Sequence, residues 1–220
     1  MSLLTICQNA AREIGLSIPS QVFGSNLPEV QKLLRYAQKA GIRCLKTSAW
    51  QSLKKEATFT SVAGEEQTGM LPSDFDRFVS DTMWNITDNI QILGSIPSNE
   101  WAGLKGSGYN DISKPKFVLR ESKVLITPAM QAGKTITFEY ITNEFVLDSL
   151  GNPQNRFLHD NDISLIDEEL LTLGTIFEYL HNEGLPFAIA GNNYEDRRKL
   201  LLENELPDYN YLITGDIFGG

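Results

Sequence analysis

Residues that commonly carry catalysis or bind metals are scarce in this sequence. Its 220 residues include two cysteines, Cys7 and Cys44, and two histidines, His159 and His181. Both cysteines fall within predicted helices, so we expect small buried hydrophobes in a reducing compartment and no disulfide framework. Neither histidine has a Cys or another His at metal-ligand spacing. We therefore expect no metal and no cofactor.

Basic residues and long apolar runs are also few. The chain has 19 Lys and Arg against 28 Asp and Glu, which gives a net charge of −9. Bulk electrostatics therefore disfavour nucleic-acid binding, although a local basic face could still provide it. No apolar run is long enough to cross a bilayer, and the N-terminus lacks the pattern of a signal peptide. We expect no membrane partner and a protein that is cytoplasmic when made.

Sequence motifs of common enzymes are incomplete or missing. Residues 133–135, Gly-Lys-Thr, resemble the end of a phosphate-binding loop, but Pro128 stands where the earlier glycine is required. Residues 160–164 begin like a calcium loop, but Leu165 occupies the position of the turn glycine. The chain has no Gly-x-Ser-x-Gly nucleophile motif. We therefore expect no enzymatic activity.

The clearest positive signal is an acidic helix over 164–184. Ser164 is a predicted cap and Gly184 a predicted stop. Seven carboxylates and no Lys or Arg lie between Asp160 and Gly184. Helical spacing places one set of apolar residues on a broad face: Leu165, Ile166, Leu170, Leu173, Ile176, Phe177 and Leu180. We expect the other helices to pack on this one.

At the same helical spacing, Glu169 falls within this apolar face. A carboxylate buried there needs an ion-pair or hydrogen-bond partner. We favour an ion pair with an arginine of the N-terminal helices. The alternative is a contact with a neighbouring chain.

Three further helices are predicted at 3–14, 27–48 and 186–205. Five basic residues follow one another along the second helix at helical spacing: Lys32, Arg35, Lys39, Arg43 and Lys46. This stripe is either a solvated helix face or an interface. As an interface it would meet an acidic surface of a neighbouring subunit, or DNA phosphates.

Period-two alternation replaces the helical pattern between the helices. Strands are predicted at 56–62, 77–80, 89–93, 116–120, 123–127 and 135–141, with a turn at 63–66 and a single helical turn at 97–101. Residues 106–114 read as a loop and 143–159 as irregular. The predicted fold class is α+β, with a helical body from 1–54 and 160–205 and an inserted antiparallel β module at 55–159.

Residues 206–220 form a predicted extended C-terminal arm. The arm is unusual for a chain end because it is apolar and aromatic. It would dock either on its own body or in a groove of a partner. The apolar residues are Tyr209, Tyr211, Leu212, Ile213, Ile217 and Phe218.

Several short sequence motifs occur along the chain in the same order as in a known family of proteins. They are Trp50, Glu56–Thr60, Leu71–Phe78, Asn99–Trp101, Phe138–Ile141 and Asp167–Gly174. In this order they resemble the head-to-tail adaptor (connector) proteins of tailed bacteriophages, including the podovirus tail-tubular gatekeepers. The resemblance covers most of residues 1–200, and the segment after Leu206 lies outside it.

The resemblance implies a structural protein of the virion neck or tail. Such adaptors form a ring, usually a dodecamer, that binds the portal protein, continues the DNA channel without binding DNA specifically, and provides the platform for the next tail (nozzle) protein. It implies that the arm residues named above contact the portal. For the contact between subunits, charge segregation favours Lys32, Arg35, Lys39 and Arg43 against Asp167 and Glu168. Alternatives are another neck or tail protein such as a stopper or tail terminator, a ligand-binding module, or a DNA-binding module.

Overall fold

The computed structural model describes residues 2–205 and confirms the expected α+β class. The chain divides into two compact units. The helical unit comprises Met1–Ser52 and Phe145–Gly220, and the β unit comprises Leu53–Glu144. The helical unit is thus built from both chain ends, with the β unit inserted between them.

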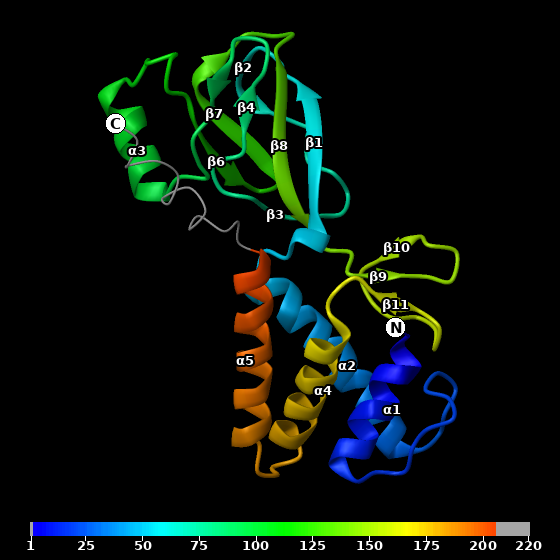
Figure 1. The fold of residues 1–220 in the computed structure, drawn as a ribbon. Helices are drawn as coiled ribbons and strands as arrows, with labels where there is room; N and C mark the ends of the chain where they lie inside the picture. Colours follow the sequence, from blue (N-terminus) through cyan, green and yellow to red (C-terminus); the bar gives the residue numbers. More distant parts are fainter. Residues whose placement is uncertain (1, 206–220) are drawn as a thin grey trace, which may run out of the picture. The chain divides into compact units, whose positions relative to one another are not determined.

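Four helices form most of the helical unit (Figure 1). They are α1 (Leu3–Ile14), α2 (Pro28–Thr47), α4 (Glu168–Asn182) and α5 (Ala188–Glu205). As expected, the acidic helix α4 is central, because α1, α2 and α5 all pack against it. Its side chains Leu170 and Leu171 are buried, and Gly174 lets the helix approach Ala40 and Tyr194 closely.

Helix α4 begins later than the sequence pattern predicts. Asp167, not Ser164, is its N-cap, and the Asp167 side chain accepts a hydrogen bond from the Leu170 backbone N–H at 2.9 Å. Ser164 lies instead in a short strand, β11 (Ile163–Ser164), paired with β9 (Val146–Leu147). The tertiary pairing of Ser164 with Val146 therefore takes precedence over the local capping signal.

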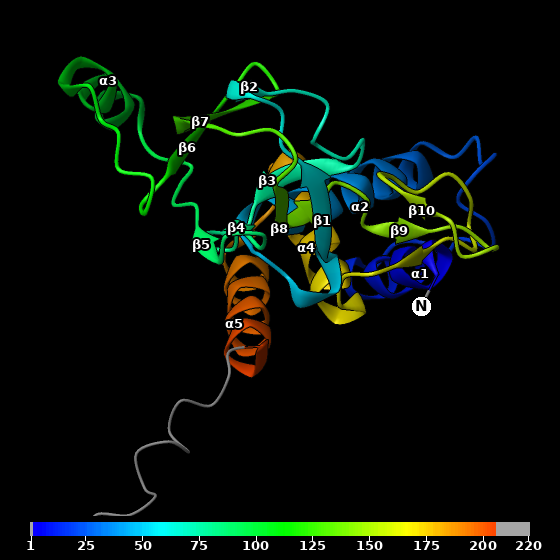
Figure 2. The same ribbon diagram turned by 90° about the horizontal axis from the view of Figure 1, so that it is seen from above.

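The predicted irregular segment 143–159 also contains structure. A three-stranded sheet joins β10 (Pro153–Gln154), β9 and β11 (Figure 1). A bridge between Ser2 and Ile163 sets β11 beside the start of α1, and Figure 2 views β9, β10 and α1 from above. Phe145 and Phe157 are buried within the helical unit, where their rings meet edge to face. The β unit consequently ends at Glu144 rather than at residue 159.

The β unit contains eight strands and one helix. Its strands are β1 (Lys54–Thr60), β2 (Gly64–Gln67), β3 (Phe75–Phe78), β4 (Trp84–Asn85), β5 (Ile90–Gln91), β6 (Lys116–Arg120), β7 (Lys123–Met130) and β8 (Thr135–Thr142). One antiparallel sheet has the order β1–β8–β4–β5, with β3 also paired to β8, and the other has the order β2–β7–β6. The predicted turn at 63–66 is largely strand β2. The predicted single turn at 97–101 extends into helix α3 (Ser98–Ser107).

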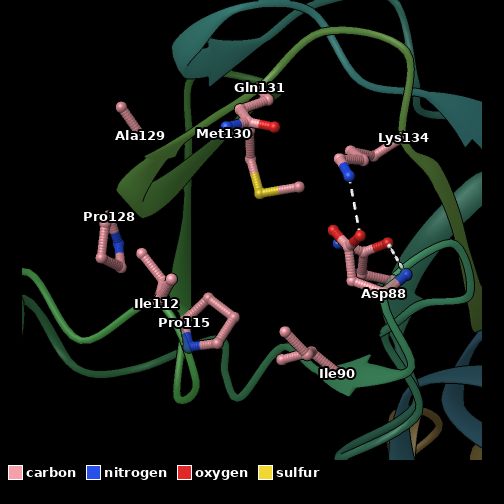
Figure 3. A pocket seen from close by; sticks show the side chains of 10 residues that line it. Asp88, Ile90, Ile112, Pro115, Pro128, Ala129, Met130, Gln131 and Lys134 are labelled. Atoms are coloured by element: carbon pink, nitrogen blue, oxygen red, sulfur yellow. Dashed lines mark hydrogen bonds and ion pairs between the residues drawn. The ribbon is translucent and has the colours of Figure 1, made fainter.

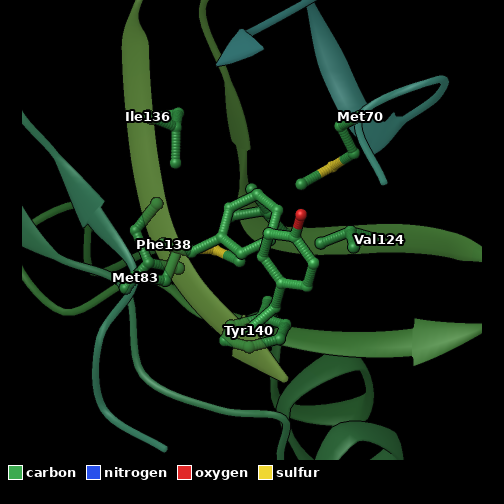
Figure 4. Close-up of a cluster of buried hydrophobic side chains, with 9 residues drawn as sticks. Met70, Met83, Val124, Ile136, Phe138 and Tyr140 are labelled. Atoms are coloured by element: carbon green, nitrogen blue, oxygen red, sulfur yellow. The ribbon is translucent and has the colours of Figure 1, made fainter. Parts of the chain in front are cut away.

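Side chains from both sheets form the core of the β unit (Figure 4). Alternation along β8 sends Ile136, Phe138 and Tyr140 into this core. Phe78 contacts both Phe117 and Phe138 edge to face, with ring centroids 5.0 and 5.2 Å apart. Between them, Thr135, Thr137 and Glu139 point to the other face of β8.

Candidate functional site

The basic stripe of α2 and the carboxylates of α4 lie against each other within one chain. Glu178 is the centre of this charged seam, because its side chain is 0% exposed and accepts contacts from two cations of α2. Lys39 Nζ lies 2.7 Å from Glu178 Oε2, and Arg43 Nε lies 2.6 Å from Glu178 Oε1. Burial alone would raise the pKa of Glu178, but the hydrogen bonds from Lys39 and Arg43 hold it below its ordinary value.

A second ion pair extends the seam toward the end of α4. Lys32 Nζ donates to Glu183 Oε2 at 2.6 Å, and the Tyr36 hydroxyl donates to Glu183 Oε1 at 2.8 Å. The hydrogen bonds from Lys32 and Tyr36 lower the pKa of Glu183, and the hydrogen bond to Glu183 raises the pKa of Lys32. Three residues of the basic stripe therefore already have acidic partners within the chain.

Arg35 differs from the other residues of the basic stripe. It is exposed on α2, and no hydrogen bond or ion pair of its side chain is found within residues 2–205. Of the four basic residues predicted to contact another subunit, Arg35 alone makes no charged contact in this part of the chain. A substitution of Arg35 therefore tests an intersubunit contact without breaking an ion pair inside the chain.

The expectation for Glu169 is wrong on two points. Its side chain is 62% exposed rather than facing the core, and its partner is Arg197 of α5, 3.1 Å away, rather than an N-terminal arginine. Arg197 also contacts Asp167 Oδ2 at 3.0 Å. The buried carboxylate of α4 is Glu178, nine residues further on and on the opposite side of the helix from Glu169. The apolar pattern indicated the Glu169 side as the buried face, whereas Leu171, Gly174 and Thr175 are buried on the side of Glu178.

Glu168 has a different environment. Its Oε1 atom is buried without a hydrogen-bond partner among the described residues, and burial raises the pKa of this carboxyl. Asp167, by contrast, is paired with Arg197, 3.0 Å away. The predicted portal-contact residues, Tyr209, Tyr211, Leu212, Ile213, Ile217 and Phe218, lie outside the described residues.

A cavity of about 320 Å³ is present in the β unit (Figure 3). Lys134 and Asp88 stand at one side, joined by a hydrogen bond of 2.7 Å, and Pro128, Ile112 and Pro115 lie across the cavity. The sequence analysis missed this cavity, because its walls come from segments far apart in the chain. Its charged groups are already paired with each other, which leaves a mostly apolar lining.

Groups able to perform nucleophilic or metal chemistry are poorly placed. Burial raises the pKa of Cys7 to about 12 and that of Cys44 to about 11, so neither thiol is activated. Within residues 2–205 no cluster of His, Cys, Asp and Glu has metal-site geometry. The described helices include none that is both long and apolar enough to cross a membrane.

Comparison with known proteins leaves the family open. No model of a known protein family matches the chain, and a search of curated proteins finds no match either.

Proposed function

We propose that this chain is a structural protein of a bacteriophage virion, the head-to-tail adaptor that forms a ring between the portal and the tail. The observation that carries the proposal is the chain order: a helical unit from both chain ends, an inserted β unit, and then an apolar arm. The order of elements fits the resemblance described above. In this role residues 206–220 bind the portal, and the ring continues the DNA channel and supports the next tail protein.

The proposed contact between subunits combines the basic face of α2 with the acidic start of α4 in the next copy. Lys32, Lys39 and Arg43 retain side-chain exposures of 45%, 47% and 38%, so their cations remain accessible while paired internally. Arg35 adds a cation without a described partner. Such a head-to-tail contact between unlike surfaces closes into a ring when the rotation between copies divides a full turn.

The internal ion pairs determine how this contact is tested. Reversing all four basic residues would disrupt the helical unit itself, because Glu178 and Glu183 would lose their partners. Arg35→Glu changes only the residue of the four that makes no charged contact within residues 2–205, and Lys199→Glu, on the exposed side of α5, is the matched control. We expect Arg35→Glu to weaken ring formation on the portal and Lys199→Glu to leave it unchanged, with circular dichroism confirming that both variants fold.

Portal binding is tested separately by cryo-electron microscopy of the full chain incubated with its cognate portal. We expect a ring stacked on the portal and loss of that ring on deletion of residues 206–220. A protein that leaves the portal bare under these conditions contradicts the adaptor function. Binding by the truncated chain would instead favour another neck or tail protein.

The cavity of Figure 3 favours one alternative, a ligand-binding module. Its volume falls at the lower end of the range for small-molecule sites. Saturable binding of a small apolar ligand, abolished by Met130→Trp, would support that alternative over the adaptor function.

A further inference from the structure

The outward face of the β1–β8–β4 sheet carries an exposed tryptophan between carboxylates. β4 pairs with β8, and β1 pairs with the other side of β8, so the three strands lie side by side (Figure 1). Trp84 is 39% exposed, whereas the other two tryptophans, Trp50 and Trp101, are each 3% exposed. The exposed Trp84 ring offers an aromatic face that a partner can cover.

Two glutamates stand directly opposite each other on this face. The strand register pairs Glu56 of β1 with Glu139 of β8, and both side chains are exposed. Directly opposed residues have Cβ atoms about 5 Å apart, and like charges there destabilise a sheet. The Glu56 carboxylate accepts a hydrogen bond from Thr137 at 2.8 Å, while the Glu139 carboxylate makes no hydrogen bond or ion pair within residues 2–205.

Trp84 and these carboxylates share one hollow. A depression of about 280 Å³ is lined by Trp84, Thr137, both glutamates and Asp81. No Lys or Arg of the described chain lines it. The basic residues of the same face, Lys54 and Arg77, both pair with Ile141, two residues beyond Glu139 along β8. Arg77 contacts Asp76 at 2.7 Å.

We propose that this hollow binds an arginine or lysine side chain presented by a segment of a partner protein. A cation over the Trp84 ring gains a cation–π contact, and the carboxylates neutralise it. The same cation relieves the repulsion between Glu56 and Glu139. A neutral sugar could also stack on Trp84, but it would leave that repulsion in place, so charge complementarity favours the cation.

This site lies in the β unit and does not depend on the adaptor function proposed above. Its test uses the ¹⁵N-labelled full chain and a capped Gly-Arg-Gly-Arg-Gly peptide, followed through the three tryptophan indole N–H signals. The Trp84 signal is identified by its loss in Trp84→Phe. We expect a saturable shift of this signal alone, because Trp50 and Trp101 are buried. A peptide with citrulline in place of arginine keeps the shape but lacks the charge, and we expect no comparable shift from it.

Substitutions of the two glutamates test whether their carboxylates bind the peptide. Glu139→Gln keeps the size of the side chain and should weaken binding about two- to fivefold, the effect of one exposed ion pair. Glu56→Gln combined with Glu139→Gln should weaken it about tenfold. Glu121→Gln, in the exposed turn between β6 and β7, is the matched control and should change nothing.

The double Gln variant also separates this proposal from a purely structural effect. It should melt at a higher temperature than the native chain, because the opposed like charges are gone, while binding the peptide more weakly. Equal shifts with arginine and citrulline peptides, no saturable shift with either, or a response to maltohexaose alone would each overturn the proposal.

Discussion

Replacing Glu178 by alanine tests the energetic role of the charged seam between α2 and α4. The carboxylate is 0% exposed and holds both Lys39 and Arg43. Removing one partner of a fully buried ion pair costs about 3–5 kcal/mol. Here the remaining cations are 47% and 38% exposed and can be rehydrated, so we expect a loss of about 2–3 kcal/mol.

The measurement is urea unfolding followed by far-ultraviolet circular dichroism, which reports chiefly on the helical unit. With a urea slope of about 2 kcal/mol per molar, the expected loss lowers the midpoint by about 1–1.5 M. Arg35→Ala is the matched control, because it removes an exposed cation of the same helix and should stay within about 0.5 kcal/mol of the native chain. A midpoint for Glu178→Ala equal to that of Arg35→Ala would refute the reasoning.

The stability of the Glu178→Ala variant relative to the native chain should depend on pH in a defined direction. The pKa of Glu178 is lowered in the folded chain from its ordinary value of 4.5, since Lys39 and Arg43 outweigh the effect of burial. A carboxyl with a lowered pKa contributes its full stabilisation above the ordinary value and loses it as the pH falls through the folded value. The stability difference between the native chain and Glu178→Ala should therefore shrink as the pH falls below 4.5.

Three further predictions concern other parts of the chain. Gly41→Ala should destabilise the helical unit by about 1–3 kcal/mol in urea unfolding, because the new methyl group would clash with the buried Phe145 ring. Cys7 and Cys44 should react with a thiol reagent only after denaturation, since burial raises the pKa of both. Asp74→Asn should lower the melting temperature at pH 7 but have less effect in acid, because burial would raise the Asp74 pKa but hydrogen bonds, led by that from Lys55, lower it.

Local patterns in the sequence were sufficient for the regular elements. Helical spacing of apolar residues placed α1 and α2, and Pro28 begins α2 as expected. Alternation placed β6, β7 and β8, where adjacent strands are joined by short turns. These elements bury one face each, so the period of apolar residues determines both their type and their orientation.

Tertiary structure decided the features that depend on distant parts of the chain. Glu169 and Glu178 lie on the same helix among similar neighbours, yet only Glu178 faces the cations of α2, which are 135–139 residues earlier. Strands β9, β10 and β11 have two residues each, too few to show a period, and their pairing exists only once the chain has folded back on itself. The sequence alone determined the longer helices and strands, such as α1, α2, β6 and β8, because their type depends on local periodicity. Packing between distant segments decided which charges are buried together and where the hollow beside Trp84 forms. No local pattern in the sequence specifies that packing.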